Sequence, residues 1–185
     1  MNCRRIALLS ILTALCIGIQ LTPRPPNVEF TSLICFAVGF MFGAAFGASL
    51  GALTMFINGF LSPWGVAGIV MPYQMAGMAL IGLTGGVYRR VLGKNPAEVK
   101  NPPKILSLEV SFLAAFLTLV YDVITNIGWA LPYGVPIIVA LVQGAWFTVI
   151  HVVSNIVFFG SAFFILVRVI SNLIGEYPWN IPKEA

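Results

Sequence analysis

Apolar stretches that approach the thickness of a lipid bilayer recur along almost the whole chain, with only short polar segments between them. A helix needs roughly 17–25 mostly apolar residues to cross a membrane. Of the 185 residues, 59% are hydrophobic and only 9% are charged, which is too little polar surface for a soluble domain of this length. The sequence therefore predicts an all-α integral membrane protein with a single membrane domain over residues 1–185.

We divide the apolar stretches into six short transmembrane helices in a compact bundle. The tract 29–61 is too long for one span and short for two, and its glycines recur every four residues, so we place a tight turn between Phe46 and Gly47. The tract 136–174 is too long for one upright span. It is either a re-entrant piece followed by a helix or one helix kinked near Gly144. The expected helices cover residues 6–21, 29–46, 47–61, 73–91, 105–128 and 136–174.

Lysine and arginine residues predict the orientation, because they favour the cytoplasmic side of a membrane. With six spans and a cytoplasmic N-terminus, Arg24 is the only basic residue outside. Both termini are then on the cytoplasmic side of the cell membrane. Counting 29–61 as one span and inverting the protein separates the charges nearly as well. The basic residues expected inside are Arg4, Arg5, Arg89, Arg90, Lys94, Lys100, Lys104, Arg168 and Lys183.

Polar side chains at membrane depth gather in the outward-facing half of this arrangement. A charged side chain costs about 2.5–3.5 kcal/mol at the centre of a span, so each is expected either to pair with another polar group or to serve the function. We expect them to bind a small polar molecule. The candidate substrate-binding residues are Asn27, Glu29, Trp64, Tyr73, Gln74, Tyr121, Asp122, Asn126, His151 and Asn155.

A proline-rich segment precedes two of these candidates. Pro23, Pro25 and Pro26 stiffen the chain, because proline fixes its own φ and restricts the preceding residue. Such a loop can hold Asn27 and Glu29 over the mouth of a cavity. The same residues also fit a turn into the next helix, with Asn27 as the N-cap and Glu29 in the first turn. The two interpretations are compatible.

Two helices carry polar pairs at a spacing of four residues. Asp122 and Asn126 share one helix face, and so do His151 and Asn155. These groups can hydrogen-bond a ligand where water is scarce, or they can tie neighbouring membrane helices together. We expect no metal at His151, because no second histidine or cysteine lies near it in the sequence, and we expect no cofactor.

The first helix has a different pattern. Ser10, Ala14 and Gly18 recur every four residues and form a small-residue stripe. Such stripes let another helix approach closely in lipid. The tract 29–61 has its own glycines for internal packing, which leaves the stripe for a partner protein. The alternative is that the stripe packs within the bundle.

Six short motifs follow one another along the chain: PNVEFT at 26–31, GFMFGAAFGASLGAL at 39–53, SPWG at 62–65, YQMAGMALIG at 73–82, YDVITN at 121–126 and HVVSN at 151–155. With the six short helices, they resemble the substrate-binding S-components of energy-coupling factor (ECF) transporters over essentially the whole chain. The resemblance implies capture of a vitamin or related micronutrient at the outer face, with cobamides and queuosine-type bases as substrate candidates.

The resemblance also implies partners. The Ser10/Ala14/Gly18 stripe would dock on a transmembrane coupling subunit driven by two ATPases, within the lipid bilayer and without nucleic acid. The chain has no G-x-x-x-x-G-K-[ST] motif, so ATP hydrolysis is expected on the partner subunits and this chain is not expected to be an enzyme.

Two other classes of function stay open. One is an intramembrane enzyme that uses Asp122 and His151 as acid and base, which requires the two groups to lie within hydrogen-bonding distance. The other is a stand-alone secondary transporter, for which we expect an internal repeat with broken helices in matching halves. No such symmetry is evident in the sequence.

Overall fold

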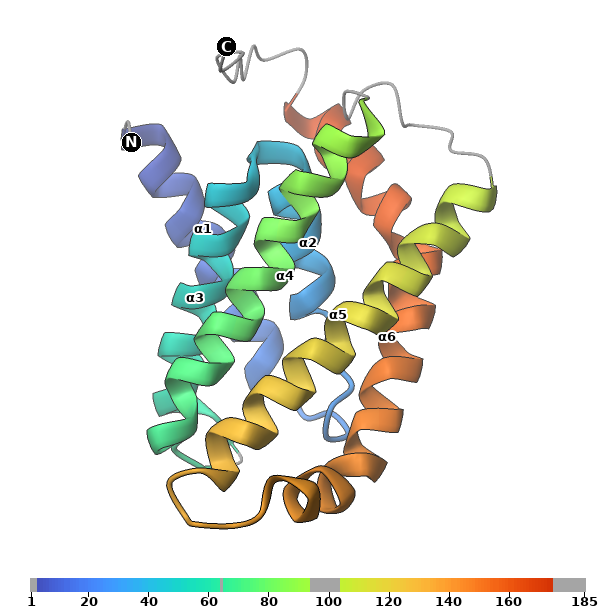
Figure 1. Cartoon of the computed structure of the whole chain (residues 1–185). Helices are drawn as coiled ribbons and strands as arrows, with labels where there is room; N and C mark the ends of the chain where they lie inside the picture. Colours follow the sequence, from blue (N-terminus) through green and yellow to red (C-terminus); the bar gives the residue numbers. More distant parts are fainter. Residues whose placement is uncertain (1–2, 64, 94–103, 175–185) are drawn as a thin grey trace.

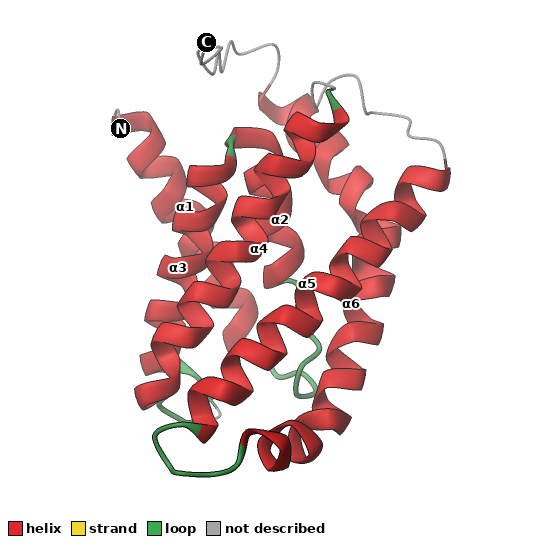
Figure 2. Cartoon of the chain, in the orientation of Figure 1, coloured by secondary structure: helices red, strands yellow, loops and turns green. Residues whose placement is uncertain are grey.

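The computed structural model describes residues 3–63, 65–93 and 104–174, and in these ranges it consists of helices and loops without strands (Figures 1 and 2). The described helices are α1 (Cys3–Leu21), α2 (Thr31–Phe42), α3 (Ala44–Leu61), the short 3-10 helix η1 (Gly68–Val70), α4 (Met71–Leu92), α5 (Lys104–Ala130) and α6 (Ile137–Ile174). The all-helical class is as predicted.

Four of the described helices are long and apolar enough to cross a membrane: α1, α3, α5 and α6. Helix α2 is apolar but shorter, with 12 residues. Helix α4 has 22 residues, is rich in glycine and ends in Arg89 and Arg90. These properties fit a membrane-embedded bundle, and the crossing of the membrane by all six helices stays a prediction.

A single glycine separates α2 from α3. Gly43 has φ 104° and ψ 156°, a conformation that glycine adopts without the steric cost that a Cβ imposes. Its N–H donates to the Gly39 carbonyl at 2.9 Å and its own carbonyl accepts from the Gly47 N–H at 3.1 Å. The tract 29–61 is therefore two helices, as predicted, but the turn lies at Gly43 and not between Phe46 and Gly47.

The other glycines of this region bring three backbones together. A methyl group on Gly47 would lie 2.5 Å from the Gly82 carbonyl oxygen, which is closer than real Cβ atoms approach. Six glycines pack in this way, and we call them the glycine seam. It joins α2, α3 and α4 and comprises Gly39, Gly47, Gly51, Gly82, Gly85 and Gly86. Small residues allow this close approach in lipid, where apolar burial alone does not favour helix association.

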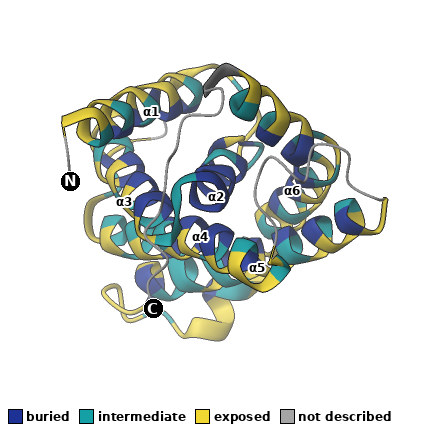
Figure 3. Cartoon of the chain, turned by 90° about the horizontal axis from the view of Figure 1, so that it is seen from above, coloured by how far each residue is buried: buried dark blue, intermediate teal, exposed yellow. Residues whose placement is uncertain are grey.

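Helix α2 occupies the middle of the bundle, where the other helices surround it (Figure 3). Ten of its 12 residues are buried. Its fully buried Phe36 and Phe40 each meet Phe163 of α6 edge to face, with ring centroids 5.3 Å apart. Edge-to-face packing is favourable for aromatic rings. A short helix that is apolar on every side is thus explained by its central position.

The two ends of the bundle differ in charge. Helix α1 begins, α4 ends, α5 begins and α6 ends at the upper end in Figure 1, where the α2–α3 junction also lies. The described basic residues Arg4, Arg5, Arg89, Arg90, Lys104 and Arg168 are near these helix ends. The loop after α1, which contains Arg24, lies in the lower half of the bundle in Figure 1. Lys94, Lys100 and Lys183 lie outside the described residues.

The last helix is longer than an upright span. Helix α6 has 38 residues, which is about 57 Å at 1.5 Å per residue. Figure 1 shows its first turns, in orange, lying across the lower end of the bundle before the helix turns upward. Of the two arrangements considered for residues 136–174, the structure has the single bent helix. In these first turns, Gly144 packs against Asn126 near the lower end of α5.

Candidate binding site

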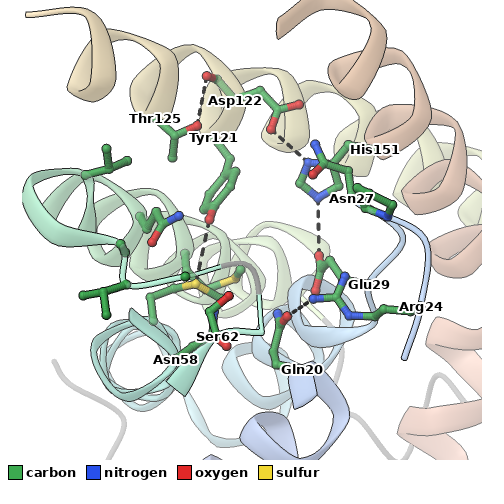
Figure 4. A pocket seen from close by; sticks show the side chains of 18 residues that line it. Gln20, Arg24, Asn27, Glu29, Asn58, Ser62, Tyr121, Asp122, Thr125 and His151 are labelled. Atoms are coloured by element: carbon green, nitrogen blue, oxygen red, sulfur yellow. Dashed lines mark hydrogen bonds and ion pairs between the residues drawn. The ribbon is translucent and has the colours of Figure 1, made fainter. Parts of the chain in front are cut away.

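The described residues line a partly open cavity of about 400 Å³ (Figure 4). The loop 22–30, which forms part of its wall, lies in the lower half of the bundle in Figure 1. Its walls come from α1, the loop 22–30, α3, the segment 62–70, α4, α5 and α6. Small-molecule sites in proteins typically measure about 300–1,000 Å³. Six of the predicted binding residues line it: Asn27, Glu29, Gln74, Tyr121, Asp122 and His151.

At the centre of the site, His151 lies between two carboxylates. Its Nδ1 is 2.9 Å from Asp122 Oδ1 and its Nε2 is 3.5 Å from Glu29 Oε1. All three residues are buried, with exposed fractions of 4–6%. Only the imidazolium form of the ring can donate to both carboxylates at once. This Glu29–His151–Asp122 cluster joins the loop 22–30 to α5 and α6.

Glu29 has a second role at the start of α2. Its Oε2 accepts the Ser32 N–H at 3.0 Å, and its Oε1 accepts the same N–H at 3.3 Å. The carboxylate thus satisfies a free backbone donor at a helix N-terminus, where negative charge is favoured. The predicted helix start needs a correction, because α2 begins at Thr31 and Glu29 takes the capping role that we expected of Asn27.

Asn27 holds the loop against α6. It has φ 60°, a left-handed conformation that asparagine tolerates better than most residues. Its Nδ2 donates to the Phe147 carbonyl at 3.2 Å, and its carbonyl accepts from Ser154 Oγ at 3.3 Å. The proline-rich loop is therefore a wall of the cavity as well as the approach to α2.

Arg24 and Gln20 fix the other side of this loop. Arg24 Nη1 donates to the Val28 carbonyl at 2.9 Å, and Nη2 donates to Gln20 Oε1. Gln20 Nε2 in turn donates to Thr31 Oγ1 at 2.8 Å. The guanidinium group thus braces the loop from within the cavity wall, as Figure 4 shows.

Three predicted residues are not among those that line the cavity. Tyr73 packs its ring against Gly128 of α5. Asn126 donates to the Asp122 carbonyl at 2.7 Å and lies over Gly144, where an added methyl group would be 2.6 Å from its Oδ1. Asn155 is fully buried and donates to Thr118 Oγ1 at 2.9 Å. Their contacts join α5 to α4 or to α6. Trp64 lies outside the described residues.

Sequence reasoning missed much of the cavity wall. Gln20 and Asn58 are isolated amides in apolar helices, so the cost of a polar group at membrane depth was the signal that could have selected them. Apolar members such as Met55 and Met78 carry no such signal. Pro26 was expected in the loop over the cavity, and Thr125 shares the expected ligand-binding face of Tyr121 and Asp122. The other lining residues outside the predicted binding set are Gln20, Arg24, Met55, Asn58, Ser62, Gly65, Val66, Ala67, Val70 and Met78.

Several buried polar atoms of the cavity wall have no hydrogen-bond partner. They are Asp122 Oδ2, Asn58 Oδ1, Gln74 Oε1 and Arg24 Nε. An unpaired buried donor or acceptor costs about 1–3 kcal/mol, so native proteins keep few of them. These four atoms belong to residues that line the cavity, but the protein itself covers the atoms. The charged and amide side chains of the wall are what make the cavity suited to a polar molecule.

The small-residue stripe of α1 lies on the exposed side of that helix. Ser10, Ala14 and Gly18 are all exposed, and a methyl group added to Gly18 would meet no atom within 4 Å. The buried face of α1 is formed by other residues, including Leu9, Cys16, Ile17 and Gln20. The stripe is thus not used for packing among the described residues.

Comparison of the chain with protein-family models, with curated proteins and with solved structures gives no match.

Proposed function

We propose that this protein is the substrate-capture subunit of an ATP-driven importer of the ECF type. The observation that carries the proposal is a cavity of about 400 Å³ that is lined by charged and amide side chains inside an otherwise apolar helical bundle. In this proposal the cavity faces the outside of the cell membrane. The basic helix ends and both termini face the cytoplasm, as the preference of arginine and lysine for that side favours.

The exposed stripe of α1 is the proposed docking surface for the transmembrane coupling subunit. Ser10, Ala14 and Gly18 allow close helix contact, and the stripe lies on the opposite face of α1 from its buried residues. The two ATPase subunits would act through that coupling subunit. Substrate capture and docking on the coupling subunit would then use separate surfaces of this protein.

The substrate would be a vitamin or a related micronutrient. A cavity of about 400 Å³ suits a compact molecule. Of the two compound classes suggested by the sequence resemblance, a queuosine-type base is compact, whereas a cobamide carries a large corrin ring. The volume therefore favours the smaller class.

The test separates capture from docking. Ser10→Leu should abolish uptake in cells, because a large side chain blocks close helix contact, while detergent-purified protein still binds its ligand. Ser161→Leu is the matched control, since Ser10 and Ser161 are both exposed and both donate to the carbonyl four residues earlier, at 3.0 and 2.6 Å. Normal uptake by the Ser10→Leu variant, or equal loss in both variants, would contradict the docking assignment.

One observation favours a second candidate function. His151 Nδ1 and Asp122 Oδ1 are 2.9 Å apart, which meets the geometric requirement for an intramembrane acid–base enzyme. The distinguishing measurement is the mass of the ligand before and after incubation with purified protein. A binding subunit returns its ligand unchanged, whereas conversion that is lost in the His151→Gln variant would favour the enzyme.

A further inference from the structure

The loop 22–30 is tied to its neighbours in two different ways. Towards α1 it is held by Arg24, which donates to the Val28 carbonyl and to Gln20. At the start of α2 the carboxylate of Glu29 accepts the Ser32 N–H. These contacts use a guanidinium, an amide, a carboxylate and backbone groups, none of which ordinarily gains or loses a proton near neutral pH. This side of the loop therefore keeps its charges.

Towards α6 the same loop depends on a histidine. His151 Nε2 faces Glu29 Oε1 at 3.5 Å. Two neutral hydrogen bonds accompany this contact, one from Asn27 to the Phe147 carbonyl and one from Ser154 to the Asn27 carbonyl. Hydrogen bonds between ionised groups are roughly twice as strong as neutral ones. Of these three polar contacts, only the one with His151 changes its strength with the charge of a ring.

The proton on the ring decides whether this contact holds. An imidazolium donates from both nitrogens, whereas a neutral imidazole has one donor and one acceptor. The shorter contact, 2.9 Å between Nδ1 and Asp122 Oδ1, keeps the remaining proton of a neutral ring on Nδ1. Nε2 then turns a lone pair towards Glu29 Oε1, so that attraction becomes repulsion. His151 lines the cavity, which gives the leaving proton a path to water.

The other ionisable groups around the ring come from α5, the loop, α2 and α6. Tyr121 of α5 meets the imidazole edge to face, with ring centroids 5.8 Å apart. Arg24 lines the same cavity but is already paired within the loop and with α1. Helix α2 has no charged residue, and its one titratable side chain is Cys35. In α6 the other charged residue is Arg168, near the opposite end.

Phe30 limits the part of the loop that can move. Its ring stacks on Phe158 of α6 with centroids 4.0 Å apart, a contact that does not depend on pH. Without the histidine contact, the loop would be fixed at α1 and at Phe30, and only the two neutral hydrogen bonds would hold it to α6 between these points. Pro26, Asn27 and Glu29 line the cavity, so movement of this part opens the cavity wall.

We propose that the Glu29–His151–Asp122 cluster is a proton-operated latch, which holds the loop 22–30 against α6 when His151 is protonated and lets the loop part from α6 when the proton leaves. Because the loop is a wall of the cavity, the latch controls access to the cavity. This inference goes beyond the proposed function, since it holds whatever the cavity binds and whether or not the protein imports it.

Hydrogen exchange measured by mass spectrometry tests the latch without a ligand. The full-length protein in detergent is compared at about pH 6 and about pH 9, on either side of the range in which histidine commonly titrates, with rates corrected for intrinsic exchange at each pH. Glu29→Gln is the first variant, because an amide can accept from Nε2–H or donate to a bare Nε2 and so makes the contact independent of the proton. His151→Gln, which has no proton to lose, is the second.

Ser154→Ala is the matched control. It removes a neutral contact between the same loop and α6 but leaves the cluster intact. A loop that is merely loosened should exchange faster at both pH values, whereas loss of the latch should remove the difference between them.

In the wild-type protein, the amides of the loop 22–30 should exchange at least about tenfold faster at the higher pH, as expected when a hydrogen bond to a charged group is lost. Glu29→Gln and His151→Gln should abolish this difference, and Ser154→Ala should keep it. The amides of α2 should be equally protected at both pH values.

Three results would overturn the inference. They are equal protection of the wild-type loop at both pH values, a pH difference that persists in the glutamine variants, and loss of α2 protection together with that of the loop, since the whole bundle would then be responding. No uptake is measured, so each of these results would leave the proposed import function standing.

Discussion

The glycine seam and the cavity lie in the same helical bundle but differ in how closely they are packed. In the seam, a methyl group on Gly47 would be 2.5 Å from a neighbouring carbonyl oxygen, so there is no room for one added carbon atom. The cavity keeps about 400 Å³ and leaves buried polar atoms unpaired. Close packing stabilises a membrane fold, whereas unpaired polar groups destabilise it. The comparison places the candidate binding site where the bundle is not closely packed.

The largest expected effect comes from filling the seam. Gly47→Leu should leave little folded protein, because its side chain would overlap the backbones of both Gly39 and Gly82 and the helices would have to separate to make room for it. Size-exclusion chromatography in detergent measures the monodisperse fraction. Gly18→Leu is the control, since a methyl group there meets no atom within 4 Å. Equal yields from the two variants would mean that the seam is not tightly packed.

Removing the imidazole ring between the two carboxylates should have the next largest effect. His151→Leu leaves Glu29 and Asp122 buried without their shared partner, and breaking a buried charge pair costs about 3–5 kcal/mol. Thermal unfolding in detergent should show a marked fall in Tm. The double variant His151→Leu with Asp122→Asn should recover part of the loss, because one uncompensated charge is gone. A double variant no more stable than the single one would contradict the charge argument.

A smaller effect is expected where a polar residue packs instead of lining the cavity. Asn126→Leu should lower the stability by about 1 kcal/mol through the lost hydrogen bond and contact with Gly144, with unchanged ligand retention. Thermal unfolding and mass spectrometry of the retained ligand measure the two quantities. Reduced retention at unchanged stability would return Asn126 to the binding residues.

The smallest change in stability should come from Gln74, a residue of the cavity wall. Gln74→Met removes an unpaired buried oxygen, so the free energy of unfolding should rise by up to about 1 kcal/mol while ligand retention falls. Functional sites often show this exchange of stability for binding. A fall in Tm without loss of ligand would show instead that Gln74 serves the fold.

The spacing of polar residues along a helix predicted only part of the candidate site. Asp122 and Asn126 share a helix face by spacing, as do His151 and Asn155, but only the first member of each pair lines the cavity. Four residues along a helix is about 6 Å, enough to pass from an open cavity to a tight contact between helices. Asn155 meets Thr118 and Asn126 lies over Gly144, contacts that no spacing along one helix can reveal.

The apolar composition predicted the all-helical class, and the length and glycines of 29–61 predicted its separation into two helices. The positions of the basic residues in the sequence predicted that most of them gather at one end of the bundle. All three predictions depend only on the order of residues along the chain. The exact turn at Gly43 needed the structure, since four glycines were equally able to provide it and three-dimensional packing engages Gly39, Gly47 and Gly51 elsewhere. Only the tertiary structure decided which polar groups meet. The partner of His151 depends on how α5, α6 and the loop 22–30 are placed around α2, and that placement follows from contacts between residues distant in the sequence.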